Sequence, residues 1–222
     1  MITKLPRWIE FGAFLLAFIA GLVNVIGFLG FDRLAISHVS GTATLLGAAL
    51  YDPSLSSTSH LAGVLVSFLL GAAISGFLLR GSALTVSHHY DTALMTEAAL
   101  FFIAYLLLAK GSIFGYFAAA TACGVQNALA TSYSGAIVRT THLTGIFTDL
   151  GIMIGMMVRG QTFDRRKAVL FLLIISGFLI GGIGGAFLFQ SVAFKALLVP
   201  AVLCVALAFS FRRYRKRQKR VF

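Results

Sequence analysis

Charged residues are scarce in this 222-residue sequence: Asp, Glu, Lys and Arg together make up 11%, against 59% hydrophobic residues. With a mean hydropathy of +0.93, the chain cannot form a soluble domain with a polar exterior, so that class is excluded. The apolar residues form runs over 11–31, 61–79, 92–109, 168–189 and 196–211, each about long enough to cross roughly 30 Å of hydrocarbon as a helix. Lipid offers no partner for open backbone groups, so we expect an all-α, polytopic helical membrane protein.

Cysteine is rare as well. The two cysteines, Cys123 and Cys204, lie inside apolar runs and not at metal-ligand spacing, so we predict no disulfide framework, no metal site and no cofactor. The sequence also lacks the H-E-x-x-H and G-x-S-x-G signatures of common hydrolases. A membrane-embedded enzyme is therefore the least favoured of the function classes considered, and we expect that the protein is not an enzyme.

The charge that is present is basic and concentrated at one end of the chain. Of 18 Lys and Arg residues, seven lie between 212 and 220, directly after an apolar run, and the net charge is +11. The positive-inside rule and attraction to anionic lipid headgroups predict such a cluster, so we expect a lipid partner and no nucleic acid. The tail therefore predicts cytoplasmic termini.

One motif is written twice. Residues 37–47 read SHVSGTATLLG and residues 141–151 read THLTGIFTDLG, which share the pattern [ST]-H-[VL]-[ST]-G-x-x-T-x-L-G. Upstream, AGLVN at 20–24 corresponds to CGVQN at 123–127. Each copy of the motif is thus preceded by a helix that carries Gly-x-x-Asn.

The repeat continues downstream of the motif, where SFLLGAAISGFLL at 67–79 aligns with GFLIGGIGGAFLF at 177–189. We therefore predict one integral membrane domain made of two homologous halves, 1–110 and 111–222, with four membrane segments each. Internal duplication of this kind is common among transporters, in which the substrate site lies between the repeats.

These stretches, together with GVQNA at 124–128 and TTHLTGIFTDLG at 140–151, resemble the YoaK family of bacterial inner-membrane proteins. The likeness covers nearly the whole chain. The first half departs from the commoner family pattern, which has an aspartate in place of Asn24 and an asparagine in place of Thr42. The family is of unknown function and is sometimes labelled permease, so the resemblance implies an inner-membrane helical protein and supplies no substrate.

Two topologies fit the sequence. If all eight segments cross the membrane, the two repeats are parallel. If the motif segments 37–51 and 141–158 dip in and return, six segments cross and the repeats are inverted. Both arrangements put both termini and most basic residues in the cytoplasm, so charge does not choose between them. The length of 141–158 slightly favours eight crossings.

Polar residues inside the apolar segments are the candidate ligands. On a helix, His142 and Asp149 share one face while Thr148 lies on the opposite face. An aspartate in a membrane helix is costly unless it is paired or wet, so Asp149 is predicted either to carry a coupling proton or cation, or to pair with His142 or a nearby arginine. The predicted substrate- or ion-binding residues are Asn24, His38, Thr42, Gln126, Asn127, His142, Thr148 and Asp149.

Glycines that recur every four residues predict close helix packing. The predicted packing residues are Gly41, Gly71, Gly145, Gly177, Gly181 and Gly185. Glu97 lies about one turn into its apolar segment, which favours an interfacial position.

The favoured function is a transporter, permease or channel for an unidentified small solute, with proton or cation coupling through Asp149 as a further hypothesis. The alternative is an assembly or lipid-organising protein, which would use the glycine ridges for partner helices and the basic tail for anionic lipid. Homo-oligomerisation is open in either case.

Overall fold

The computed structural model describes residues 7–31, 33–54, 56–79, 90–134 and 139–218. Within these ranges the regular structure is entirely helical, which confirms the all-α fold class. The helices are α1 (Arg7–Leu29), α2 (Val39–Tyr51), α3 (Thr58–Leu78), α4 (Tyr90–Leu108), α5 (Phe114–Ser134), α6 (Leu143–Val158), α7 (Arg165–Val192), the 3-10 helix η2 (Ala193–Leu197) and α8 (Leu198–Gln218).

Four helical stretches of the described chain are long and apolar enough to span a membrane. They are Glu10–Leu29, Thr58–Leu78, Tyr90–Leu108 and the continuous stretch Arg165–Arg213, whose 49 residues include both α7 and α8. The short helices α2 and α6 have 13 and 16 residues. A membrane-spanning helix needs about 20 residues, and neither short helix reaches that length.

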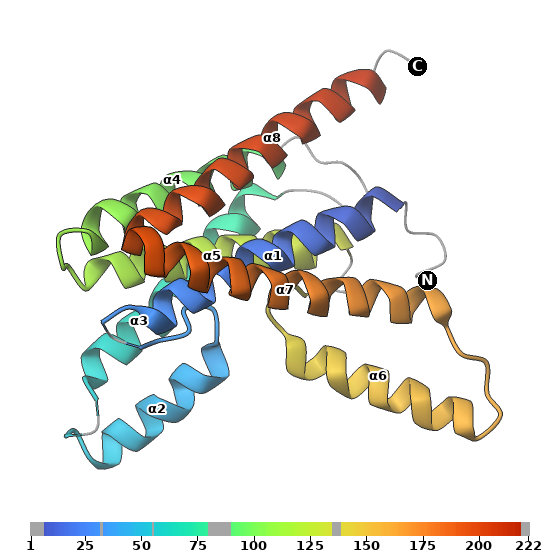
Figure 1. Ribbon diagram of the computed structural model, residues 1–222, viewed down its shortest axis with the longest axis horizontal. Coiled ribbons are helices and arrows are strands. Elements are labelled where there is room, and N and C mark those ends of the chain that lie inside the picture. Colours follow the sequence, from blue (N-terminus) through green and yellow to red (C-terminus); the bar gives the residue numbers. More distant parts are fainter. Residues whose placement is uncertain (1–6, 32, 55, 80–89, 135–138, 219–222) are drawn as a thin grey trace.

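Glycines bring α1 and α7 into direct backbone contact, and the two helices lie side by side in Figure 1. A Cβ added at Gly177 would lie 2.6 Å from the Phe14 carbonyl oxygen, and one at Gly185 would lie 2.6 Å from the Leu22 carbonyl oxygen. Moving eight residues toward the C-terminus of α7 thus moves the contact eight residues toward the C-terminus of α1. The pair is therefore parallel and closely packed, as expected of small residues in membrane helices.

The pair α3/α5 repeats this geometry with residues of the opposite halves. The matching contacts, in which an added Cβ would overlap a backbone carbonyl, are Gly181 with Phe18 and Gly21 with Phe178 in α1/α7, and Gly71 with Thr121 and Gly124 with Phe68 in α3/α5. The contact residues of α1 and α5 are 103 positions apart in the sequence, and those of α3 and α7 are 110 positions apart. These are two of the spacings at which the sequence repeats. The first helix of residues 1–110 therefore packs against α7, and the first helix of residues 111–222 packs against α3.

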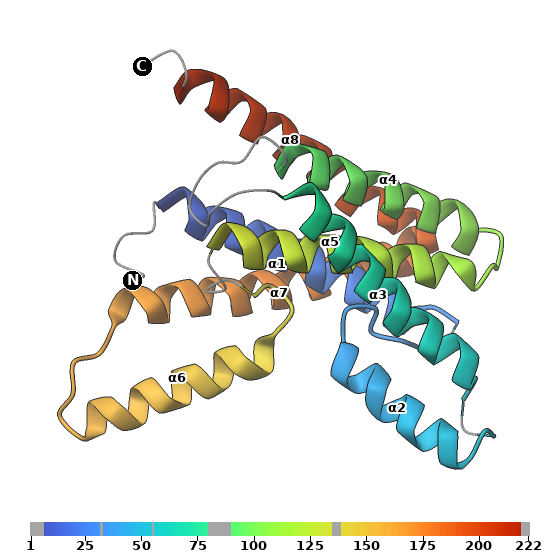
Figure 2. The same ribbon diagram turned by 180° about the vertical axis from the view of Figure 1, so that it is seen from behind.

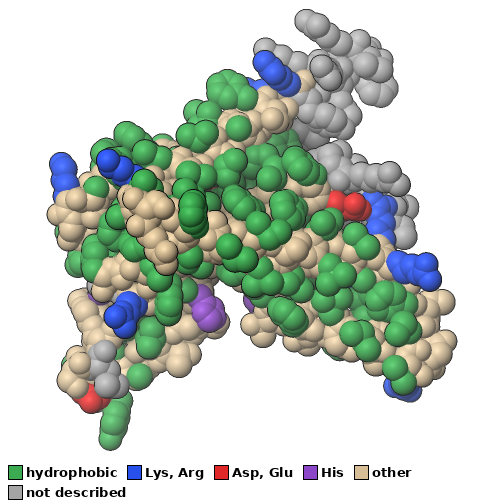
Figure 3. Space-filling view, in the orientation of Figure 1, with side chains coloured by type: hydrophobic (Ala, Val, Ile, Leu, Met, Phe, Trp, Pro, Cys, Tyr) green, Lys and Arg blue, Asp and Glu red, His purple; other side chains and the backbone are tan. Residues whose placement is uncertain are grey.

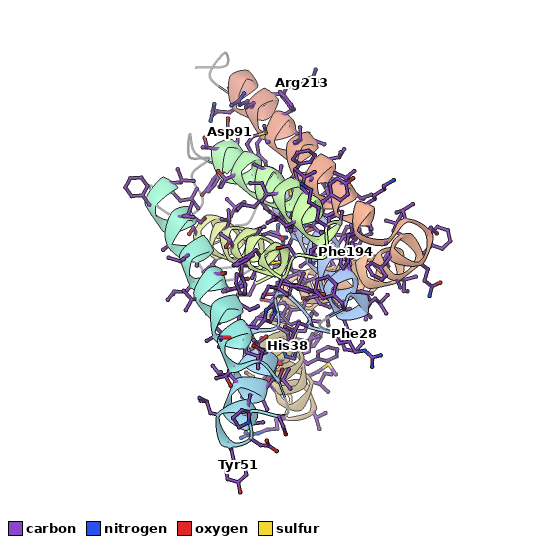
Figure 4. All side chains as sticks on the ribbon, turned by 90° about the vertical axis from the view of Figure 1, so that its left-hand side faces the viewer. Phe28, His38, Tyr51, Asp91, Phe194 and Arg213 are labelled. Carbon is purple, nitrogen blue, oxygen red and sulfur yellow. The ribbon has the colours of Figure 1, made fainter. Side chains whose placement is uncertain are left out.

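Helices α4 and α8 pack against each other on one side of this arrangement and run in opposite directions (Figure 1). At the end where α4 begins, Asp91 is 4% exposed and accepts a hydrogen bond from Arg212 Nε at 2.5 Å, while Arg215 lies 3.6 Å away. Figure 4 shows Asp91 beside the charged end of α8. This paired carboxylate ties the two helices together where the basic tail starts.

The six long helices alternate in direction along the chain, so α1 and α5 run opposite ways (Figures 1 and 2). The short helices stand apart from this bundle. Both begin near the middle of the molecule: α2 runs back toward the end at which α1 finishes, and α6 runs toward the end at which α5 finishes. Each short helix thus points toward the end of the molecule at which the long helix before it, α1 or α5, finishes.

Candidate functional site

A cleft of about 730 Å³ lies between the N-terminal ends of α2 and α6. Figure 3 shows it as a notch between the two short helices with histidine side chains at its inner edge. Its lining residues are Asn24, Val25, Phe28, Ala35, Ser37, His38, Val39, Ser40, Phe68, Asn127, Thr141, His142, Leu143, Thr144 and Phe178. Histidine is the only titratable type among these residues, so the cleft has a mainly apolar lining with a few polar groups and lacks a carboxylate or an amine.

The lining comes from both halves in equivalent pairs. The pairs are Asn24 with Asn127, Ser37 with Thr141, His38 with His142, Val39 with Leu143, Ser40 with Thr144, and Phe68 with Phe178. One member of each pair comes from α1, the segment before α2, α2 or α3, and the other comes from α5, the segment before α6, α6 or α7. The cleft therefore lies at the point where the two repeats meet, which is where duplicated transporters bind their substrates.

The two histidines owe their position to the glycine three residues later. His38 and His142 are the N-cap residues of α2 and α6, and neither side chain caps its own helix. The nearest atom to a Cβ at Gly41 would be His38 Nδ1 at 2.8 Å, and the His142 imidazole would overlap a Cβ at Gly145. The His-x-x-Gly spacing thus lets each ring fold over the first turn of its helix. Gly41 and Gly145, predicted to pack between helices, instead make room for these rings.

Backbone donors of both short helices are also available at the cleft. The first intrahelical bonds run from Thr42 N to the His38 carbonyl and from Ile146 N to the His142 carbonyl. The amides of the first turn before these residues have no acceptor within their own helix. Two helix N-termini with their partial positive charge therefore meet at the cleft from opposite directions.

The Gly-x-x-Asn helices contribute one asparagine each, but the two asparagines differ. Asn24 donates from Nδ2 to Ser37 Oγ at 2.7 Å and accepts from the Ser37 backbone N–H at 2.7 Å. Asn127 lines the cleft in the other half, and its buried Oδ1 has no hydrogen-bond partner in the described chain. The two halves are thus alike in sequence and unlike in hydrogen bonding at this position.

Of the predicted binding residues, the structure brings Asn24, His38, Asn127 and His142 together and places the others elsewhere. Thr42 is buried and donates to the His38 carbonyl at 3.2 Å, and Thr148 is exposed and donates to the Thr144 carbonyl at 2.9 Å. Gln126 is buried and donates from Nε2 to the carbonyl oxygen of Leu16, which joins α5 to α1. None of these three side chains lines the cleft, and each donates to a backbone carbonyl.

Asp149 does not line the cleft. Its side chain is 46% exposed, and Oδ2 lies 3.3 Å from Lys167 Nζ at the start of α7. The carboxylate therefore has a basic partner, as in the structural alternative considered for it, although that partner is a lysine of the next helix.

Sequence reasoning missed several residues. Ser37 and Thr141 belong to the repeated motif and line the cleft, and their equivalence at a spacing of 104 could have marked them. Glu97 was expected at an interface but is fully buried in the middle of α4, beside the Cys204 thiol. A single hydropathy profile cannot signal that burial, since lipid and protein surroundings are equally apolar.

The chain was compared with known protein families, curated proteins and solved structures. Neither the curated proteins nor the solved structures contain a match to the chain. A family model does match, over residues 12–210, which include every helix from α1 to α8 at least in part. The chain therefore belongs to the family described as "Protein of unknown function (DUF1275)".

Proposed function

We propose that the protein is a membrane transporter, permease or channel, for a small solute, and that the central cleft is its solute site. The observation that carries this proposal is the cleft lining, which consists mainly of equivalent residues from two interleaved halves. Irregular backbone and helix N-termini at membrane depth are tolerated only when protein or a water-filled cavity surrounds them. The two motif segments supply both features at one place.

The arrangement of the helices supports six crossings and two re-entrant segments in inverted repeats. Six long helices alternate in direction, while α2 and α6 are too short to span and begin at the cleft. Discontinuous helices whose N-termini point at the substrate are characteristic of inverted-repeat transporters. The eight-crossing alternative would need α2 and α6 to extend well beyond their observed ends.

Charge supports an orientation with both termini in the cytoplasm. Among the basic residues that the structure describes, only Arg33, Lys110 and Lys195 lie at the end where α1, α4 and α7 finish. The positive-inside rule therefore assigns the opposite end to the cytoplasm of the bacterial inner membrane. The basic tail there is suited to anionic headgroups.

The experiment that tests the proposal uses cysteine reporters in intact membranes. Ser40→Cys and Thr144→Cys place a thiol in the cleft, whereas Leu69→Cys on α3, at a position 66% exposed, places one toward lipid. The native cysteines are at most 1% exposed, so they give little background. A membrane-impermeant thiol reagent is expected to label both cleft positions and to spare the lipid-facing control.

Uptake of a panel of small solutes into proteoliposomes then measures transport directly, with His142→Ala expected to abolish it. If both cleft cysteines label as slowly as Leu69→Cys, the cleft is closed to water and the transport proposal is wrong. Binding of liposomes without any uptake would favour the lipid-organising alternative.

A further inference from the structure

The two re-entrant segments are held differently, although their sequences correspond. In the first half, two hydrogen bonds of 2.7 Å fasten Ser37, just before α2, to Asn24 of α1. In the second half the corresponding residues are Asn127 of α5 and Thr141, just before α6. Among the described residues no hydrogen bond joins this second pair, and Asn127 Oδ1 is buried without a partner.

The second segment carries another unsatisfied group. Thr140 is 0% exposed, and its hydroxyl has no partner in the described chain. Its counterpart in the first half is the apolar residue Ile36, which is buried at 2% exposure. A buried polar group without a partner disfavours the arrangement that contains it, so an arrangement that pairs these groups would be favoured.

We propose that Asn24 with Ser37 and Asn127 with Thr141 are alternating latches of the two re-entrant segments. The first latch is closed and the second is open in the observed state. The transport cycle closes the second as it opens the first, which exchanges the conformations of the two halves. This inference rests on the transport function proposed above and names the contacts that switch.

Interleaved packing gives a physical reason for such an exchange. The α1/α7 and α3/α5 pairs share two equivalent glycine contacts, so each re-entrant segment follows a helix that belongs to the same kind of close pair. Both closed forms then have the same kinds of bond, an amide paired with a hydroxyl and with a backbone N–H. Two states of similar free energy are what a cyclic transporter requires, because neither state then traps the solute.

The test compares Asn24→Ala with Asn127→Ala by the labelling of the two cleft reporters. Asn24→Ala removes the closed latch, so Ser40→Cys should label faster and Thr144→Cys slower. Asn127→Ala removes the latch of the other state, so the ratio of the two rates should move in the opposite direction. Each shift is expected to be at least about fivefold, because each variant removes two latch hydrogen bonds and the loss of one alone shifts a two-state equilibrium by about that factor.

A double variant sharpens the comparison. With both asparagines replaced, the two biases cancel and the labelling ratio should return toward that of the parent protein. Ser37→Ala and Thr141→Val repeat the experiment on the hydroxyl side and serve if either asparagine variant does not fold. Thr148→Ala, which lies outside the cleft lining, is the matched control and should leave the ratio unchanged.

The outcomes separate this inference from the proposed function. If the cleft reporters label but both asparagine variants shift the ratio in the same direction, or if the double variant behaves like Asn24→Ala alone, the latch inference is overturned while transport stands. If neither reporter labels in the parent protein, the transport proposal fails first, and the latches fail with it.

Discussion

If the sequence repeat reflects equivalent helix contacts, replacing a glycine at a helix crossing should lower the free energy of unfolding equally in both halves. Gly181→Ala would press a methyl group onto the Phe18 carbonyl, and Gly71→Ala would press one onto the Thr121 carbonyl. At the neighbouring Gly177 the added carbon would lie 2.6 Å from an oxygen, whereas carbon–oxygen contacts normally relax to about 3.3 Å. The helices must therefore separate by at least several tenths of an ångström along the crossing.

The magnitude follows from two opposing effects. Overpacking of this kind costs about 3 kcal/mol at the upper end of its usual range, since the obstacle is backbone and not a flexible side chain. The higher helix propensity of alanine offsets at most about 1 kcal/mol. We therefore expect each variant to lower the free energy of unfolding by about 2 kcal/mol, with Gly71→Ala and Gly181→Ala equal within about 1 kcal/mol.

Reversible unfolding in mixed micelles measures this quantity, with Gly76→Ala as the matched control on α3. A Cβ at Gly76 meets nothing within 4 Å, so the control should be neutral or slightly stabilising. The double variant of Gly71 and Gly181 should be additive, because the two glycines lie in different interfaces, whereas that of Gly21 and Gly181 should cost less than the sum. A control as damaging as Gly71→Ala would refute the packing argument.

Three further predictions concern side chains at and around the site. Asp149→Asn should change the free energy of unfolding by less than about 1 kcal/mol, because its pair with Lys167 is exposed, and should retain full uptake with unchanged pH dependence; a folded variant without pH-dependent uptake would restore the coupling hypothesis. Asp91→Ala should lower the free energy of unfolding by about 1.5 kcal/mol in the same assay, since it removes the charge-assisted hydrogen bond from Arg212, whose side chain is half-exposed; a change near zero would show that the pair does not stabilise the fold. Gly145→Ala should displace the motif imidazole and reduce uptake while the protein stays folded on size-exclusion chromatography; normal uptake would show that the ring position is unimportant.

The class of the protein and its repeat could be read from the sequence. A membrane helix satisfies its own backbone hydrogen bonds, so apolar length predicts α1, α3, α4, α7 and α8 locally and needs no knowledge of their neighbours. The four-residue glycine spacing likewise predicted close contact at Gly71, Gly177, Gly181 and Gly185, because only a missing side chain permits backbone approach. The repeated motif drew attention to His38 and His142, and the structure places both at the cleft.

The tertiary structure decided which helix each glycine ridge contacts, because a surface of small residues permits close approach by any helix and does not specify one. Only the fold shows that α1 packs on α7 of the other half, that Glu97 is buried, and that Asp149 turns to Lys167. Only the fold distinguishes Asn24, which is paired, from Asn127, which is not. Ser37 lies within hydrogen-bonding distance of Asn24, whereas no hydrogen bond joins the corresponding Thr141 and Asn127 in the described chain, because tertiary packing and not the shared motif sets the distance between each segment and its asparagine.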